Sequence, residues 1–274
     1  MKVKYVFDHH DINPELYEAK FNSRGFFYKV MLFFERQTFK HADYSIATNE
    51  SYKEIAVTRG RMPAERVAVI RSGPQLDRLR LTEGNIIYKK GKNFLIAYLG
   101  VLGDQEGIDL LLEAFSMLLN ERTDVQLAIV GGGTSLNKLK ELSEKMALDK
   151  HVDFYGRVSD ELMIDILNTA DVCVNPDKPT TMNNLSTMNK IMEYMALKKP
   201  IVQFNLKEGK FSAQQASLYA ENTKDFANKI NLLLNDHNLR KKMSEIGYTR
   251  VIKELSWEHE SKKLVDFYKK VFCI

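Results

Sequence analysis

"VDFYGRVSDELMIDILNTADVCVNPD", residues 152–177, decides the fold class of this 274-residue chain because it holds one complete strand–helix–strand unit. Its two ends are short apolar runs rich in valine, whereas residues 160–170 carry apolar side chains at helical spacing. A helix placed between two buried strands is the crossover that parallel strands require. The stretch therefore predicts a parallel sheet with helices packed on its faces.

The same alternation extends from about residue 93 to residue 205. Further strands are predicted at 94–100, 125–133 and 200–205, and further helices at 108–122, 135–148 and 186–198. The strands are apolar throughout rather than alternating, which is typical of a sheet covered on both faces. We therefore expect a complete, doubly wound, Rossmann-like α/β domain.

The first ninety residues predict a smaller, partial α/β domain. Strands are expected at 4–11, 43–49 and 66–73, with helices at 15–21 and 26–42 between the first two. The polar stretch 81–93 is typical of a linker. We expect three parts: an N-terminal acceptor-side domain over 1–85, a donor-binding domain over 86–257, and a C-terminal helix, 258–274, that packs back on the first part.

Composition excludes several classes of protein. The chain is 44% apolar and 28% charged with a net charge of +4, a composition typical of soluble globular domains. It has no apolar run near the roughly 20 residues that span a bilayer, and its basic residues alternate with acidic ones, which weighs against a nucleic-acid partner. Two cysteines, Cys173 and Cys273, do not suggest a disulfide framework. We expect a cytoplasmic protein, with peripheral binding at the inner face of the membrane left open.

Four loops at the carboxyl ends of the predicted strands are candidate ligand sites, because open parallel sheets bind ligands there. They are 100–107, 131–135, 156–160 and 175–187. Gly131, Gly132 and Gly133 would let the backbone approach a ligand, although a tight strand-to-helix turn needs glycine as well. The dinucleotide pattern GxGxxG and the P-loop are both absent from the sequence, which argues against a nicotinamide dehydrogenase and an ATPase.

The stretch "STMNKIMEYMA", residues 186–196, has two interpretations. In the first, Ser186 or Thr187 caps a helix, and Lys190 and Glu193 form a surface pair. In the second, the polar start of the helix binds a diphosphate while Glu193 accepts hydrogen bonds from a ribose diol. The second interpretation predicts a nucleotide-sugar site. No group of side chains has the spacing of metal ligands, so we expect neither a metal nor a cofactor beyond the nucleotide-diphosphate sugar donor.

The chain resembles the retaining GT-B glycosyltransferases of family 4. The resemblance is carried by "YLGVLGDQEGIDLLLEAF", "LAIVGGG", "VDFYGRVSDEL", "ADVCVNPD" and "NKIMEYMALKKPIV", which follow in the family's order and spacing, and by "VFDHHDINPELYEAKF" near the start. It covers essentially the whole chain. It implies a transferase that moves a sugar from a nucleotide-diphosphate donor to an acceptor hydroxyl with retention, in bacterial surface glycan synthesis.

The resemblance also implies roles for individual residues. The catalytic candidates are His10, Lys190 and Glu193. The acceptor side would be shaped by His9, Asp11 and Glu15. The donor site would be formed by Gly100, Gly103, Gln105, Gly131, Gly132, Gly133, Gly156, Arg157, Val158, Asn175, Ser186, Thr187 and Asn189.

Three positions depart from the family pattern. Leu185 stands where the first glutamate of the E-x7-E motif is expected, and Val101 and Glu106 replace the usual arginine and lysine near the leaving diphosphate. Lys190 or Arg157 would then supply the missing positive charge. We interpret these changes as a variant site.

Relatives have several βα units before the "HD" segment that do not precede it here. We therefore expect a partner chain that supplies the missing N-terminal portion, or a truncated copy with an unpaired strand edge that favours association. The partners expected are the donor, a glycan or lipid-linked acceptor and this second chain. The alternatives to a transferase are a donor-binding subunit inactive alone and a sugar-nucleotide epimerase. Residues 25–41, aromatic and basic, either bind lipid or form a core helix.

Overall fold

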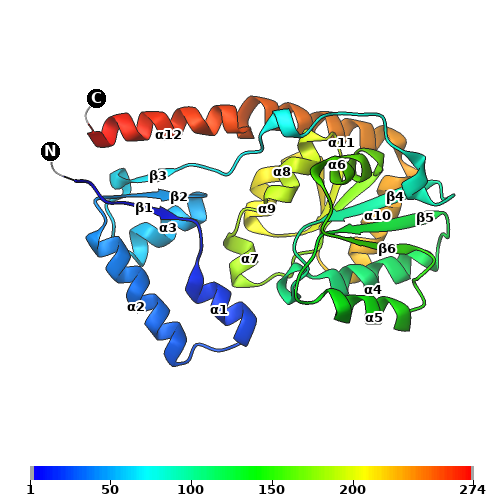
Figure 1. Ribbon diagram of the computed structural model, residues 1–274, viewed down its shortest axis with the longest axis horizontal. Helices are drawn as coiled ribbons and strands as arrows, with labels where there is room; N and C mark the ends of the chain where they lie inside the picture. The colour runs from blue at the N-terminus through cyan, green and yellow to red at the C-terminus, as the bar shows by residue number, and fades with distance from the viewer. Residues whose placement is uncertain (1–2, 273–274) are drawn as a thin grey trace.

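The computed structural model of the chain describes residues 3–272 and consists of two lobes, each built on a parallel sheet (Figure 1). The first lobe has a three-stranded sheet in the order β1-β2-β3, and the second has six strands in the order β6-β5-β4-β7-β8-β9. The two lobes lie side by side, and the C-terminal helix runs from the end of the second lobe along one edge of the first. Within the described residues, no helix is long and apolar enough to cross a membrane.

The second lobe is doubly wound, as the alternation of strands and helices predicts. Its strands are β4 (Phe94–Leu99), β5 (Val125–Val130), β6 (Val152–Gly156), β7 (Val172–Asn175), β8 (Ile201–Phe204) and β9 (Ser217–Ala220). Its helices are α4 (Ile108–Leu119), α5 (Leu136–Lys145), α6 (Asp160–Thr169), α7 (Thr181–Leu185), α8 (Asn189–Ala196), α9 (Lys207–Ala213), α10 (Thr223–Asn235) and α11 (His237–Arg250). The strand order reverses between β4 and β7, which is where ligands bind in such sheets.

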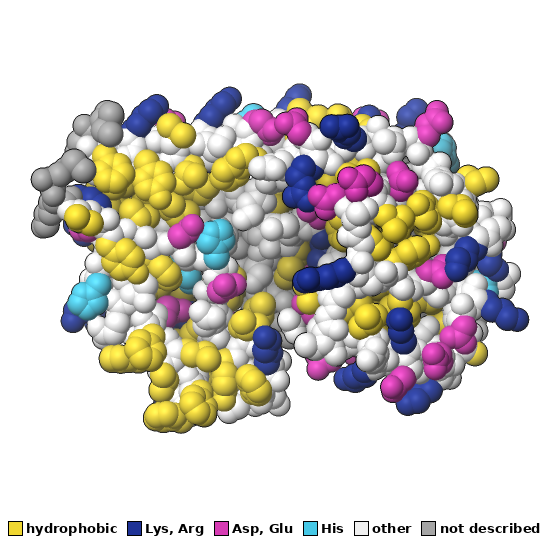
Figure 2. All heavy atoms as spheres, viewed as in Figure 1, with side chains coloured by type: hydrophobic (Ala, Val, Ile, Leu, Met, Phe, Trp, Pro, Cys, Tyr) yellow, Lys and Arg dark blue, Asp and Glu magenta, His cyan; other side chains and the backbone are white. Residues whose placement is uncertain are grey.

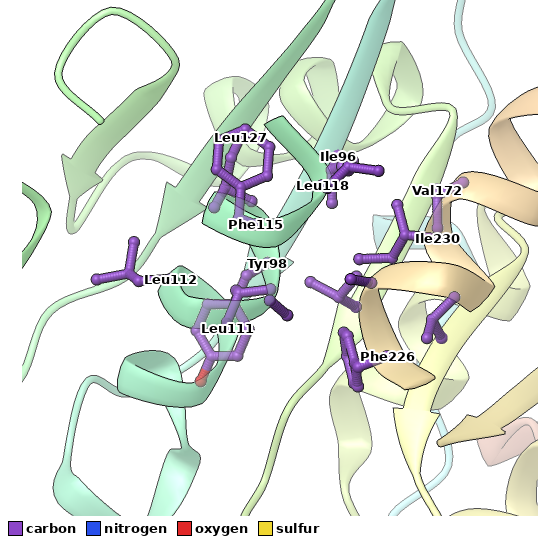
Figure 3. Close-up of a cluster of buried hydrophobic side chains, with 14 of the residues drawn as sticks. Ile96, Tyr98, Leu111, Leu112, Phe115, Leu118, Leu127, Val172, Phe226 and Ile230 are labelled. Atoms are coloured by element: carbon purple, nitrogen blue, oxygen red, sulfur yellow. The ribbon is translucent and has the colours of Figure 1, made fainter. Parts of the chain in front are cut away.

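Strand β4 shows how the sheet divides its side chains between two cores. Ile96 and Tyr98 point to the face covered by α4, α5 and α10, while Leu95 and Ala97 point to the face covered by α6 and α8. Figure 3 shows the first of these cores, in which Phe115 of α4 and Ile230 of α10 lie among the strand side chains. All of these side chains are fully buried, which explains why the strand sequence is apolar without alternation.

The first lobe is smaller and has a smaller core. Its strands are β1 (Val6–His9), β2 (Tyr44–Ala47) and β3 (Val67–Val69), and its helices are α1 (Asn13–Phe21), α2 (Phe26–His41) and α3 (Glu50–Thr58). Its main buried cluster includes Ile12, Phe39, Tyr52 and Met62. Strand β1 is an edge of this sheet, and β2 pairs with it in parallel register.

The last helix, α12 (Trp257–Phe272), returns from the second lobe to the first. Phe267 packs against Ile46 of β2 and Ile70 just after β3, and the buried carboxylate of Glu260 accepts a hydrogen bond of 2.8 Å from the Arg71 backbone N–H. The helix therefore ties the two lobes together. Cys173 is a buried free thiol, and Cys273 lies outside the described residues.

The start of α8 differs from the first interpretation of "STMNKIMEYMA". The helix begins at Asn189 with Met188 as its N-cap, and no side chain caps it. Ser186 ends α7 instead, and its hydroxyl donates to the Met182 carbonyl oxygen at 2.8 Å. A short extra helix therefore precedes α8, and the two hydroxyls are available for contacts between the lobes.

Gly131, at the end of β5, is required by packing. Its φ is +136°, and a Cβ there would lie 1.8 Å from the Gly100 carbonyl oxygen. We expect Gly131→Ala to lower the free energy of unfolding by about 2 kcal/mol or more, through strain and displacement of the β4 loop. Gly132→Ala is the matched control, because its Cβ would meet only Arg157, in ordinary contact at 3.4 Å or more. Urea denaturation checks this, and equal loss in both variants would contradict it.

Candidate functional site

The lobes face each other across a cleft that opens at the point where the strand order reverses. Two adjoining cavities of about 420 and 440 Å³ fill it, and His10, Ser72, Asn189 and Glu193 line both. Figure 2 shows the hollow at the centre of the molecule, between the two lobes. The loops after β4 and β7 and the start of α8 form one wall, and residues that follow β1 and β2 form the other.

Glu193 lies on α8, one turn after its start, where the two cavities meet. No group in residues 3–272 donates a hydrogen bond to its carboxylate. Burial raises the pKa of this carboxyl, and the positive charges of Arg78 and Lys190 only partly oppose the effect. A carboxylate with unused acceptor capacity at the meeting point of two cavities is suited to receive hydroxyl donors from a ligand.

Lys190 is held by a buried aspartate. Its Nζ lies 3.0 Å from Asp177 Oδ1 and 3.4 Å from the Tyr98 hydroxyl, and it lies over the Tyr98 ring. Burial lowers the pKa of Lys190, but the charges of Asp177 and Tyr98 and their hydrogen bonds to the ammonium together outweigh it, so the pKa lies above its ordinary value. The ammonium is therefore charged at the cleft, although Asp177 already balances part of its charge.

The glycine loops of the second lobe are hydrogen-bonded to one another. The Gly100 N–H donates to the Val130 carbonyl oxygen at 3.0 Å, and the Gly131 N–H donates to the Gly156 carbonyl oxygen at 2.9 Å. Gly100 and Gln105 line the cleft, whereas Gly103 is bonded through its N–H to the Glu106 carboxylate at 3.0 Å. The predicted donor residues that do not line either cavity are Gly103, Gly131, Gly132, Gly133, Gly156, Arg157, Val158 and Asn175.

Ser186 and Thr187 lie where the two lobes touch. The Asn49 amide donates to the Leu185 carbonyl oxygen at 2.9 Å and to the Thr187 hydroxyl at 3.0 Å. The Tyr52 and Ser186 hydroxyls lie 3.0 Å apart. Both predicted donor-binding hydroxyls line the cleft, but each also holds the first lobe against the loop before α8.

A buried ion pair completes this contact between the lobes. Arg71 Nη1, from the segment after β3, lies 3.2 Å from Glu208 Oε2 of α9, and both side chains are almost fully buried. The same Nη1 donates to the Thr187 hydroxyl at 3.3 Å, and the Ser51 hydroxyl donates to the other Glu208 oxygen at 2.7 Å. Separating the two groups of such a pair would leave uncompensated buried charges, which costs free energy. The contact therefore opposes any change in the distance between the lobes.

On the first lobe, His10 and Asp11 line the cleft and Glu15 does not. His10 Nε2 lies 3.0 Å from Asp8 Oδ1, and both side chains are more than half exposed. Glu15 is turned into the lobe, where Arg59 Nη2 donates to Glu15 Oε2 at 3.1 Å. The structure therefore brings His10 opposite Glu193 and Asn189, and separates Glu15 from them.

His9 is buried inside the first lobe, against the rings of Phe7, Phe39 and Tyr52. Among residues 3–272, neither ring nitrogen has a hydrogen-bond partner. Burial and the charge of Arg59 lower the pKa of His9 to about 4, and the backbone of Asp11 opposes this only weakly. His9 therefore supports the backbone beneath His10 as a neutral ring.

Sequence reasoning missed several residues of the cleft. Asp177, Thr48, Tyr52 and Ser72 all line it, and Asp177 gives Lys190 its main partner. The sequence carries a signal for Asp177, because it is an acidic residue two positions after a buried strand, in the candidate ligand loop 175–187. Asn175, two residues earlier, is fully buried, and neither of its amide atoms has a hydrogen-bond partner in the described part of the chain. Within residues 3–272, no group of three His, Cys, Asp or Glu side chains is arranged to hold a metal ion.

Comparison with known proteins shows the family. The profile of the family described as "Glycosyl transferases group 1" matches residues 82–250, well over half of the chain. The chain belongs to the glycosyl transferases group 1 family. The chain is 26% identical over 269 residues to the capsular polysaccharide biosynthesis glycosyltransferase CapM of Staphylococcus aureus. That match covers 90% of the chain and 67% of CapM.

Solved structures show the fold. Sucrose-phosphate synthase from Thermosynechococcus elongatus matches this group 1 chain with a TM-score of 0.83 at 18% identity, over 100% of the chain and 69% of the synthase. HepE of Anabaena, solved with UDP and glucose, matches with a TM-score of 0.81 at 17% identity, over 97% of the chain and 72% of HepE. These similarities confirm the predicted GT-B fold.

The pH dependence of stability tests the burial of His9. The unfolded chain takes up a proton on this ring near pH 6.5, whereas the folded chain does so only near pH 4. The folded state therefore loses stability as the pH falls from 6.5 to 4, by up to about 3 kcal/mol. His9→Phe keeps the ring contacts and removes the proton uptake, so urea denaturation at pH 7.5 and pH 5 should show a smaller loss in the variant. An equal loss would contradict the buried neutral ring.

The ionised side chain of Glu193 should lower the free energy of unfolding at neutral pH. Since burial raises the pKa of this carboxyl, the folded chain holds its proton to a higher pH than the unfolded chain, and ionisation destabilises the fold. Glu193→Gln should match the parent chain below about pH 4 and melt at a higher temperature at pH 7.5. The control Glu113→Gln, at an exposed position of α4, should leave the melting temperature of the parent unchanged at both pH values. A lower melting temperature for Glu193→Gln at neutral pH would contradict the arrangement.

Proposed function

We propose that this chain transfers a sugar from a nucleotide-diphosphate donor to an acceptor hydroxyl with retention of anomeric configuration. The observation that carries the proposal is the carboxylate of Glu193, which lies at the junction of two cavities, opposite His10, and has no hydrogen-bond donor within residues 3–272. Membership of the glycosyl transferases group 1 family supports the reaction class. The UDP and glucose bound to the structural neighbour HepE support a nucleotide-sugar donor.

The donor would lie along the start of α8. Glu193 accepts hydrogen bonds from the ribose hydroxyls, and the diphosphate lies near the backbone of Gly100 and the α8 N-terminus, where N–H groups carry partial positive charge. Lys190 adds a positive charge, which its ion pair with Asp177 balances in part. We assign the base to the backbone at 156–158, which lies outside both cavities but is joined to the loops beside the cleft by the Gly131–Gly156 hydrogen bond.

The reaction needs no side-chain nucleophile. The bond between the sugar C1 and the diphosphate oxygen breaks, and the nucleoside diphosphate leaves with the electron pair. The acceptor oxygen forms the new bond to C1 from the same face, and its proton passes to the departing diphosphate. His10 and Asp11, on the opposite wall, position the sugar and the acceptor. Asn189, Ser186 and Thr187 contribute polar groups on the donor side.

The acceptor is proposed to be a glycan, carried on a lipid at the inner face of the membrane. The similarity to CapM, whose name places it in capsular polysaccharide biosynthesis, supports this direction. The chain spans 67% of the length of CapM. In this chain, β1 lies at the edge of the three-stranded sheet. The edge of β1, which is open to pairing with a further strand, supports a second candidate, a donor-binding subunit that is active only with a partner chain.

Melting curves with sugar nucleotides test donor binding. UDP-, GDP- or ADP-sugars should raise the melting temperature, because a ligand that binds only the folded state stabilises it by about 2.7 kcal/mol at a hundred times its Kd. Glu193→Ala should abolish this shift and Glu113→Gln should retain it. Absence of a shift with every nucleotide sugar, in a folded chain, would contradict the proposal.

Turnover separates the candidates. Incubation of a shifting donor with lipid-linked glycan should release the nucleoside diphosphate and extend the glycan. Lys190→Ala should slow this by about a hundredfold, as expected when one group that stabilises the leaving charge is removed. Donor binding without turnover, restored by a partner chain, would support the subunit. Conversion of the donor sugar with no acceptor present would indicate an epimerase.

A further inference from the structure

Helix α2 exposes an unusual number of aromatic side chains. The exposed fractions of Phe26, Phe27, Phe33 and Phe34 are 75%, 62%, 56% and 62%, and Phe39 is the helix's only fully buried residue. Phe21, at the end of α1, is also exposed. Figure 2 shows these hydrophobic side chains as a patch over α1 and α2 at the lower left. A patch of this kind on a soluble domain marks an interaction surface.

The same face of α2 is basic. Phe26, Lys29, Phe33, Arg36 and Lys40 are all exposed and follow one another at three- and four-residue intervals, so they form a single stripe along the helix. The only acidic residue of α2, Glu35, lies on the other side, where Arg59 Nη2 donates to its Oε2 at 2.7 Å. We call this stripe, with Phe27 and Phe34, the α2 face. Its net charge is positive, with no exposed carboxylate of the helix to balance it.

The C-terminal half of the α2 face borders a basic cavity of about 530 Å³. Besides α2, the cavity is lined by the end of α3 and the segment 60–66, and its cationic side chains are Arg36, Lys40, Arg59, Arg61 and Arg66. Arg59 is paired with Glu15 and Glu35. In the part of the chain that the structure describes, none of the other four cationic side chains is in an ion pair. The cavity is thus suited to an anionic group such as a phosphate.

We propose that the α2 face and the adjoining cavity bind an anionic lipid bilayer. The phenylalanines enter the boundary between headgroups and acyl chains, and the cavity takes a lipid phosphate. Aromatic side chains on one helix face with only cationic charges among them match such a surface in both polarity and charge. A second copy of the chain fits less well, because a symmetric contact would place the basic stripe against itself.

Membrane binding by the α2 face is separate from the transfer reaction, since it uses neither Glu193 nor the residues of the cleft. The α2 face lies on the first lobe, which also carries His10 and Asp11 on the acceptor side of the cleft. Binding through this face would therefore place the acceptor wall close to the bilayer. A lipid-linked acceptor would then reach the cleft without leaving the membrane.

Co-sedimentation with lipid vesicles tests the proposal. The chain should bind vesicles of phosphatidylcholine mixed with phosphatidylglycerol at low salt, bind them less at high salt, and bind pure phosphatidylcholine weakly. The pair Arg61→Gln with Arg66→Gln should weaken binding by more than about tenfold, since each basic residue near such a surface contributes about 1 kcal/mol. Phe33→Ser with Phe34→Ser should weaken it at all salt concentrations.

Two control pairs make the same chemical changes elsewhere. Lys241→Gln with Lys242→Gln removes two exposed charges from α11, and Ile86→Ser with Ile87→Ser removes two exposed apolar side chains from the linker. Both should bind vesicles as the parent does. Equal binding by all variants, or a response to free inorganic phosphate only, would overturn the proposal. So would self-association that Phe33→Ser with Phe34→Ser abolishes without any vesicle binding. The melting shift with a sugar nucleotide should be unchanged in every variant, so this result is independent of the proposed reaction.

Discussion

The buried contact between Arg71 and Glu208 sets the distance between the lobes. It lies beside the hydrogen bonds that Asn49 and Tyr52 make to the segment 185–187, and the guanidinium also packs on the ring of Phe211 at 4.0 Å. An ion pair that is almost fully removed from water tolerates little separation, because neither charge has another partner of equal strength nearby. The cleft exists at its present width because this contact and α12 hold both of its walls.

The positive charge of Lys190 has a partner in the cleft before any ligand binds, whereas Glu193 has none within residues 3–272. Asp177 and Tyr98 hold Lys190 in a fixed position, so a donor diphosphate would meet an oriented ammonium that needs no reorganisation. Glu193 is the opposite case, since it is half-buried, no group within residues 3–272 donates to its carboxylate, and burial raises its pKa. Ligand hydroxyls would offset that effect of burial. A group that destabilises the free protein but not the complex is a common feature of binding sites.

The two ends of the first lobe present different chemistry. Towards the second lobe it offers small polar side chains, Thr48, Ser72 and Asp11, that suit a hydrated ligand. On its outer side, the α2 face offers exposed phenylalanines and unpaired basic side chains. The sequence stretch 25–41 admitted both a core helix and a lipid-binding helix, and the structure shows one helix with a side that faces the lobe and an exposed side that is aromatic and basic. Glu35 and Phe39 face the lobe, while Phe26 and Phe33 face solvent.

The sequence by itself determined the architecture of the second lobe, because continuous apolar strands with helical crossovers allow only a covered parallel sheet. It also determined the family, and it placed Glu193, Lys190 and Asn189 at the sheet's carboxyl edge, since strand direction fixes where each loop lies. Only the tertiary structure decided that Asp177 is the partner of Lys190, that Ser186 and Thr187 join the lobes, and that His9 and Glu15 turn inward while His10 faces the cleft. The contacts between the lobes join residues more than a hundred positions apart, such as Asn49 with Thr187, and the direction of His9 and His10 depends on which side of a strand end each side chain points. Lys190 and Asp177 are only 13 positions apart, but they lie in different elements, so no helical or strand spacing pairs them. No local pattern of residues contains that information.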